Sequence, residues 1–225
     1  MADRSSPVSF AGPKGDVEAL WTPAAAATAT AVLAHGAGAG MSHPFMEGAA
    51  SGLAANGISV LRFNFPYVTQ GRRSPDRPDV AIATWRSALE QAPQSGRGLP
   101  IVAGGKSYGG RMASMLAAEM GDGFPARALA FFGYPLHAPG RSDQPRDVHL
   151  ASITVPMLFI EGTQDALARF DLIESLVRRL RPLARLHVIE GGDHSFRVRG
   201  ARRPDLEIGR ELGAVAAAFV EEAIA

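Results

Sequence analysis

Cysteine is absent from this chain, the net charge is close to zero and no long apolar run occurs. Without cysteine there can be no disulfide, thiolate metal site or cysteine nucleophile, and the absence fits a reducing compartment. The 23 basic and 22 acidic side chains leave a formal charge of +1, which creates no long-range field to attract nucleic acid or an acidic membrane. No stretch approaches the roughly 20 apolar residues that cross a bilayer, and residues 1–7 lack the apolar centre of a signal peptide. We therefore expect a cytoplasmic protein with no nucleic-acid or membrane partner.

Short apolar segments alternate with helical patterns along the chain. Expected strands lie at residues 30–34, 58–63, 100–105, 128–134, 155–160 and 186–189, and expected helices at 45–56, 79–92, 111–120, 166–180 and 204–225. Residues 8–10 and 17–21 read as an antiparallel hairpin at the sheet edge. This order predicts an α/β fold with a doubly wound, mostly parallel sheet, in one domain over residues 1–225.

Two expected loops bear on the site. Residues 137–152 are too few for a lid domain, so we expect an open site with at most one helical turn in this segment. Residues 69–78 are polar and turn-forming, which predicts a mobile surface loop near the site. Its Arg72 and Arg73, with Tyr67 before them, are candidates to border a substrate, although solvated charge is the commoner role for such arginines.

A Gly-x-Ser-x-Gly turn lies between an expected strand and an expected helix, with Ser107 at its centre. That context is typical of a nucleophile elbow, in which the serine backbone is strained and Gly105 and Gly109 leave no room for side chains. A glycine-rich loop with an incidental serine is the alternative interpretation. The flanking strand and helix, and partner residues downstream in the right order, favour the elbow.

A second glycine-rich turn, His-Gly-Ala-Gly-Ala-Gly, begins at His35 after an apolar strand. Acyl transfer needs two backbone N–H donors for the oxyanion, one from the residue after the nucleophile and one from a loop after an earlier strand. We assign these donors to Tyr108 and Ala37, with Gly38 as the alternative to Ala37, and read His35 as a structural histidine bracing the loop. A dinucleotide fingerprint would need a glycine opening a helix and an acid after the next strand, and neither is clear.

The base and the acid follow the serine in the order that elbow enzymes require. His194 lies in a glycine-rich turn after the last strand and is the preferred base, and Asp165 follows the preceding strand and is the preferred acid. Glu161 remains the serious alternative to Asp165, whereas Asp193 adjoins His194 and is better suited to stabilising the turn. The other histidines weighed as bases were His137, His149 and His187. No histidine spacing suits zinc.

Four motifs together resemble the α/β-hydrolase superfamily: the turn at residues 35–40, the elbow at 104–110, Glu-Gly-Thr-Gln-Asp at 161–165 and Gly-Gly-Asp-His-Ser-Phe at 191–196. More narrowly, they resemble its small lidless branch, related to dienelactone hydrolases and to testis-expressed hydrolase-like proteins. The likeness covers nearly the whole chain from residue 10 and implies a triad of Ser107, Asp165 and His194. Dienelactone hydrolases carry cysteine in place of Ser107, so their substrate is not carried over.

These features predict a cofactor-independent serine hydrolase acting on a small-molecule acyl ester or thioester. Lys106, beside the serine, is read either as raising the positive potential near the oxyanion or as packing against neighbouring loops. The rival from another class is a catalytically silent, hydrolase-shaped interaction module, since some members of the resembled branch look more like subunits of assemblies than enzymes. A peptidase is less favoured, because no lid or propeller segment is present to select peptides.

Overall fold

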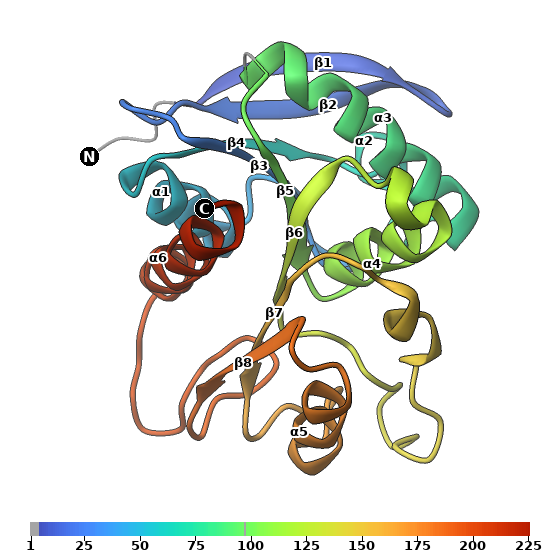
Figure 1. Ribbon diagram of the computed structural model, residues 1–225, viewed down its shortest axis with the longest axis vertical. Coiled ribbons are helices and arrows are strands. Elements are labelled where there is room, and N and C mark those ends of the chain that lie inside the picture. Colours follow the sequence, from blue (N-terminus) through green and yellow to red (C-terminus); the bar gives the residue numbers. More distant parts are fainter. Residues whose placement is uncertain (1–4, 97) are drawn as a thin grey trace.

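The computed structural model describes residues 5–96 and 98–225, which form one eight-stranded sheet with helices on both faces (Figure 1). The strand order is β1-β2-β4-β3-β5-β6-β7-β8. The strands are β1 Ser6–Gly12, β2 Gly15–Thr22, β3 Ala29–Ala34, β4 Ile58–Phe63, β5 Ile101–Lys106, β6 Ala126–Phe132, β7 Met157–Gly162 and β8 Ala184–Ile189. The helices are α1 Pro44–Ala55, α2 Pro66–Thr69, α3 Pro78–Gly96, α4 Tyr108–Met120, α5 Phe170–Arg179 and α6 Asp205–Ile224, with 3-10 turns at Gly121–Gly123 and Val148–Ser152.

The first two strands are antiparallel to each other, β2 is antiparallel to β4, and strands β3 to β8 are mutually parallel. Strands β3, β4 and β7 are buried along their whole length, as expected for parallel strands covered on both faces. The predicted doubly wound sheet with an N-terminal antiparallel edge hairpin is therefore confirmed. Within the described residues, no helix has the length and apolar character needed to span a membrane.

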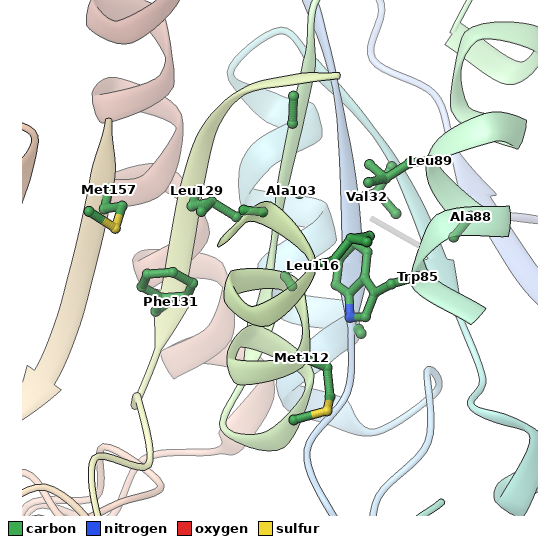
Figure 2. Close-up of a cluster of buried hydrophobic side chains, with 14 of the residues drawn as sticks. Val32, Trp85, Ala88, Leu89, Ala103, Met112, Leu116, Leu129, Phe131 and Met157 are labelled. Carbon is green, nitrogen blue, oxygen red and sulfur yellow. The ribbon is translucent and has the colours of Figure 1, made fainter. Parts of the chain in front are cut away.

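Two apolar clusters hold the layers together. On one face, α3, α4 and α5 cover the sheet; Figure 2 shows Trp85 and Leu116 of two of these helices beside Val32 and Phe131 of the strands. On the other face, α1 and α6 pack on the sheet and lie side by side in Figure 1. Because helices flank both faces, functional groups collect where the parallel strands end.

The segment between β6 and β7 contains a single 3-10 turn, Val148–Ser152, and no lid. That agrees with the expectation for residues 137–152. The loop expected at residues 69–78 differs at both ends, because α2 and the first residue of α3 extend into it.

Candidate active site

Ser107 lies between the last residue of β5 and the first residue of α4, with φ 50° and ψ −115°. A positive φ is strained for a residue with a Cβ and occurs where the surrounding structure enforces it. Here a Cβ built on Gly105 would lie 2.2 Å from the Ala34 carbonyl oxygen, and one on Gly109 would lie 2.4 Å from the same atom. In both cases the nearest atom belongs to the backbone, which cannot move aside as a flexible side chain can. The corner can therefore form only with glycine on each side of the serine, as the elbow interpretation requires.

The elbow is also held by hydrogen bonds from neighbouring elements. The Ser107 N–H donates to the Phe132 carbonyl at 3.1 Å, at the end of β6. The buried indole of Trp85 in α3 donates to the Gly109 carbonyl at 3.0 Å, which fixes the first turn of α4. The serine hydroxyl is therefore presented from a rigid strand-to-helix corner.

The structure brings Ser107, His194 and Asp165 together from the ends of β5, β8 and β7. The His194 Nε2 atom is 2.8 Å from Ser107 Oγ, and His194 Nδ1 is 2.6 Å from Asp165 Oδ2. The Asp165 side chain is fully buried, and its other oxygen accepts the Leu167 N–H at 2.7 Å. An ionised carboxylate can only accept, so Nδ1 carries a proton and Nε2 of the neutral ring accepts from the serine hydroxyl.

Glu161, the alternative acid, points elsewhere. Its Oε1 atom accepts the Tyr134 N–H at 2.5 Å, and its Oε2 atom has no hydrogen-bond partner within the described part of the chain. Burial, and next the charge of Asp165, raise the pKa of Glu161 well above its ordinary value. The structure thus places Asp165, and not Glu161, against the imidazole.

The other histidines weighed as bases are engaged away from the serine. His137 Nε2 accepts the Arg169 N–H at 3.0 Å. His149 Nε2 lies 2.8 Å from Ser114 Oγ, and burial lowers the pKa of His149 to about 4. His187 lies within β8, where it pairs in register with Ile160.

The residues expected to supply the oxyanion donors lie beside Ser107 in the chain or line the same cavity. Tyr108 is the first residue of α4, so its N–H has no partner within the helix. Ala37 and Gly38 line a cavity together with Ser107. A hydrogen bond from the Gly38 backbone lowers the pKa of the Tyr67 hydroxyl, against the larger effect of burial, which raises it. Ala37 and Gly38 both remain candidates for the second donor beside Tyr108.

His35 braces this turn, as the sequence suggested. Its ring is completely buried, with Nδ1 2.8 Å from the Gly36 carbonyl oxygen and Nε2 accepting the Phe65 N–H at 3.2 Å. Burial lowers the pKa of His35 to about 4, so the ring is neutral. A neutral ring can donate through one nitrogen and accept through the other, and both hydrogen bonds need this form.

A family comparison agrees with this geometry: residues 27–221 match the α/β-hydrolase domain family. The chain belongs to the α/β-hydrolases. The match spans most of the chain and includes the elbow, the acid and the base. The coarse functional class, a hydrolase, follows from the family.

Solved structures share the fold of this hydrolase at low sequence identity. An α/β serine hydrolase homologue from Coxiella burnetii has a TM-score of 0.73 at 21% identity, covering 94% of this chain and 96% of the other. A serine hydrolase without a lid from Xanthomonas campestris has a TM-score of 0.69 at 21% identity, covering 96% of each chain. A dienelactone hydrolase from Anabaena variabilis has a TM-score of 0.75 at 19% identity, covering 97% of each chain.

Lys106 of this hydrolase packs against the loop that carries the base. Its Nζ atom donates to the His194 carbonyl oxygen at 2.5 Å and lies 5.0 Å from the centre of the Phe196 ring. Burial lowers the pKa of Lys106 to about 8, while the carboxylates of Asp165 and Glu161 act in the opposite direction. The residue before the nucleophile therefore ties strand β5 to the loop after β8, which is one of the two roles that the sequence left open.

The hydrolase has a cavity of about 230 Å³ over Ser107. Its lining residues come from the 36–39 turn, from α1 and the residue before it, from the elbow, from the loop before α6 and from the first residue of α6. They are Gly36, Ala37, Gly38, Ala39, His43, Phe45, Met46, Lys106, Ser107, His194, Ser195, Arg197 and Asp205. Sequence reasoning missed His43, Phe45, Met46, Arg197 and Asp205. No local pattern marks these five residues, because α1 and the start of α6 meet only in the folded hydrolase.

The residues suggested as a substrate border do not line this cavity. Tyr67 is buried and donates to the Gly36 carbonyl at 3.4 Å, so it supports the turn from behind. Arg72 forms an ion pair with Asp76, and Asp76 also accepts the Tyr67 N–H at 2.9 Å. The loop at residues 70–77 thus supports the oxyanion turn and contributes no lining residue.

Proposed function

We propose that the chain is a serine hydrolase that cleaves a small acyl ester or thioester through an acyl-enzyme intermediate. The observation that carries the proposal is the position of His194, within hydrogen-bond reach of both Ser107 Oγ (2.8 Å) and Asp165 Oδ2 (2.6 Å). A serine hydroxyl becomes a nucleophile when a base takes its proton, and the base needs a third group to fix its tautomer. The spacing supports all three roles.

In the first step, Ser107 Oγ attacks the acyl carbon while its proton passes to His194 Nε2. The imidazole becomes positively charged, and the buried Asp165 carboxylate stabilises that charge without taking the proton. The carbonyl oxygen of the substrate becomes an oxyanion, for which the N–H groups of Ala37 and Tyr108 are the proposed donors. One such donor is worth roughly 10²–10³ in kcat in other acyl-transfer enzymes.

In the second half, His194 gives its proton to the leaving atom, and the bond from the acyl carbon to that atom breaks. Water then enters, gives a proton to His194 Nε2 and attacks the ester of Ser107. The bond from the acyl carbon to Ser107 Oγ breaks, His194 Nε2 returns its proton to Oγ, and the acid product departs. As proposed, the cycle uses only side chains and backbone amides, with no cofactor.

The size of the cavity supports small acyl groups. About 230 Å³ lies over the serine, below the roughly 300–1,000 Å³ typical of pockets for drug-sized ligands. Phe45 and Met46 contribute apolar wall, whereas the carbon chain of a long fatty acid would extend beyond it. We expect kcat/KM for p-nitrophenyl esters to fall from acetate to octanoate.

A fluorophosphonate probe and p-nitrophenyl acetate test the proposal together. An activated serine should be labelled covalently at Ser107, and Ser107→Ala should lose both labelling and turnover while keeping its thermal melting temperature. Serines outside the site, such as Ser152, provide the matched control: Ser152→Ala should label and turn over like the wild type. A well-folded wild type that neither labels nor turns over any ester or thioester in a graded panel would favour the silent interaction module instead.

A further inference from the structure

The loop that carries His194 continues into an arginine-rich turn. Arg197, Arg199, Arg202 and Arg203 lie within seven residues, and all four are exposed. In Figure 1 this segment runs from β8 toward the start of α6, on the same side of the molecule as α1 and α6. The chain as a whole is close to neutral, so this density of positive charge is local.

Hydrogen bonds fix this turn relative to the base. The Asp193 N–H donates to the Arg197 carbonyl at 3.1 Å, and Asp193 Oδ1 accepts the Arg197 N–H at 2.9 Å. Further along, the Ala201 N–H donates to the Val198 carbonyl at 3.1 Å, with Gly200 at φ +85°. Such a turn needs a residue that tolerates positive φ at this position, and glycine provides it. Arg199 is thereby held at the tip of the turn.

The charges on this turn are only partly neutralised. Arg197 makes a two-pronged ion pair with Asp205, at 2.8 and 2.9 Å, and Arg203 pairs with Glu211 at 2.6 Å. Arg199 and Arg202 form no ion pair with any residue in the described ranges, 5–96 and 98–225. Two exposed guanidinium groups are thus available to an anion.

A groove of about 850 Å³ is lined by residues 197–198 and 200–206 with Pro44, so Arg202 lies on its wall, while Arg199 lies beside the groove at the tip of the same turn. The groove and the cavity over Ser107 share two lining residues, Arg197 and Asp205. The cavity and the groove thus adjoin at the Arg197–Asp205 ion pair, and an elongated molecule with its reacting carbon at Ser107 would reach the groove by passing over this pair. Since the cavity over Ser107 is small, part of a large substrate must lie outside it, and the groove offers space for that part.

The chemistry indicates which end of the substrate enters the groove. His194 delivers a proton to the leaving atom, so the leaving group must lie on the His194 side of the reacting carbon. The chain leads from His194 directly to the arginine turn. His194 and Arg197 both line the cavity, and Arg197 also lines the groove, so a leaving group on the His194 side lies nearer the groove than the acyl group does.

We propose that this groove binds phosphate groups on the leaving group, so that the substrates are short acyl esters or thioesters of a phosphorylated carrier. The proposal rests on the proposed serine hydrolase function. Guanidinium groups bind phosphate through paired, charge-assisted hydrogen bonds, and they remain charged at every physiological pH. For a thioester, the bond from Ser107 Oγ to the acyl carbon forms, the carbon–sulfur bond breaks and His194 protonates the thiolate. Water then releases the acid.

S-acetyl-4′-phosphopantetheine and S-acetylpantetheine test the proposal, because they share the acetyl thioester and the carrier and differ only in the phosphate. We expect wild-type kcat/KM to favour the phosphorylated thioester by roughly tenfold or more, the scale of one charge-assisted contact. Arg199→Ala combined with Arg202→Ala should bring the ratio of the two kcat/KM values close to one, chiefly by raising KM for the phosphorylated thioester. Arg127→Ala is the matched control, because Arg127 is exposed at the start of β6, at the opposite end of the strands from the site, and its ratio should match the wild type.

A wild-type ratio near one, or a ratio that survives the double substitution, would overturn the proposal. Calorimetry separates this outcome from a failure of the hydrolase function. Coenzyme A should bind Ser107→Ala and bind at least tenfold more weakly when Arg199→Ala and Arg202→Ala are added. Equal or undetectable binding in both proteins overturns the phosphate site, whereas binding without turnover of any ester or thioester by the wild type supports the site and rejects the hydrolase function.

Discussion

Asp165 and Glu161 lie four positions apart in the chain, near the end of β7, and their surroundings differ. Asp165 lies 2.6 Å from His194 Nδ1, and the Leu167 N–H satisfies its other oxygen. Glu161 is completely buried, and its pKa is raised by burial and by the negative charge of Asp165. Two carboxyl groups that share a small buried volume repel each other when both are charged, which is one cause of the raised pKa of Glu161.

Replacing Asp165 with Asn should lower kcat for p-nitrophenyl acetate by about 10⁴-fold, because the amide favours the wrong imidazole tautomer. Glu161→Gln is the control, since the amide is isosteric with a protonated acid and can still accept the Tyr134 N–H. It should stay within about threefold of wild-type kcat. A nearly active Asp165→Asn with an inactive Glu161→Gln would show that the acid is misassigned.

Lys106 should act as a positioning residue for the His194 loop. In Lys106→Met the hydrogen bond to the His194 carbonyl is lost while most of the side-chain volume remains, and we expect kcat to fall roughly 10–100-fold through misplacement of the imidazole. The wild-type kcat should also fall as pH rises through about 8, since the ammonium that faces Asp165 and Glu161 loses its charge there. Lys106→Met should lack this alkaline decline.

Profiles of kcat against pH from 6 to 10 check this prediction. Lys14, the only other lysine of the sequence, lies in the exposed turn between β1 and β2 and provides a matched control. Lys14→Met should reproduce the wild-type profile. An unchanged alkaline limb in Lys106→Met would assign that limb to another group.

Helices α1 and α6 contact each other through glycine at four positions. A Cβ would lie 2.1 Å from the Leu206 carbonyl oxygen at Gly48 and 2.2 Å from the Phe45 carbonyl oxygen at Gly209. Gly52 and Gly213 are equally close to the backbone of the facing helix. This close approach brings α1, which supplies Phe45 and Met46, beside the start of α6, which supplies Asp205 to the cavity.

Gly209→Ala should therefore destabilise the protein by about 2–4 kcal/mol, because the new methyl group meets backbone and forces the helices apart. Urea unfolding at pH 7.5 measures the change. Gly123→Ala is the control, since a Cβ there meets nothing within 4 Å, and it should change stability by less than about 1 kcal/mol. Equal unfolding midpoints for the two variants would contradict the tight helix contact.

Among the single helices and strands, the long apolar strands and amphipathic helices can be predicted from the sequence, whereas the short elements cannot. The strand at residues 58–63 was predicted with its observed bounds, and the elbow helix within a few residues of its start. The four-residue α2 has too few positions to show a helical period, so the sequence predicts no helix at residues 66–69 and places Thr69 in the loop that follows. Its role in holding Tyr67 under the oxyanion turn depends on Asp76, whose partners no local pattern reveals.

Within the described residues, the pKa of two histidines is lowered to about 4 by burial: His35, completely buried beneath the 36–39 turn, and His149, half-buried against α4. For such groups the stabilising contribution is complete above the unfolded-state pKa of about 6.5 and is lost as pH falls toward 4. Glu161 acts in the opposite direction, because its raised pKa favours the folded state as pH falls. Acid stability is thus a balance between distant groups.

The His149→Gln variant tests the contribution of His149 to stability in acid. At pH 7.5 we expect a loss of roughly 1–2 kcal/mol in the free energy of unfolding, from the altered hydrogen bond to Ser114. Between pH 6.5 and 4 the difference from the wild type should shrink, since only the wild type has an imidazole to protonate on unfolding. Urea unfolding at pH 7.5, 5.5 and 4.5 measures this difference in unfolding free energy. A difference that grows as pH falls would contradict a neutral His149 in the folded protein.

The sequence by itself determined the alternation of strands and helices, the elbow around Ser107 and the order of serine, acid and base. Those features are local, since glycine spacing and apolar runs act within a few residues. Only the tertiary structure decided that Asp165 and not Glu161 faces His194, that Lys106 holds the His194 loop, and that His43, Phe45 and Asp205 line the cavity. Each of these depends on which strand ends and helices become neighbours, and packing between segments far apart in the chain sets that arrangement.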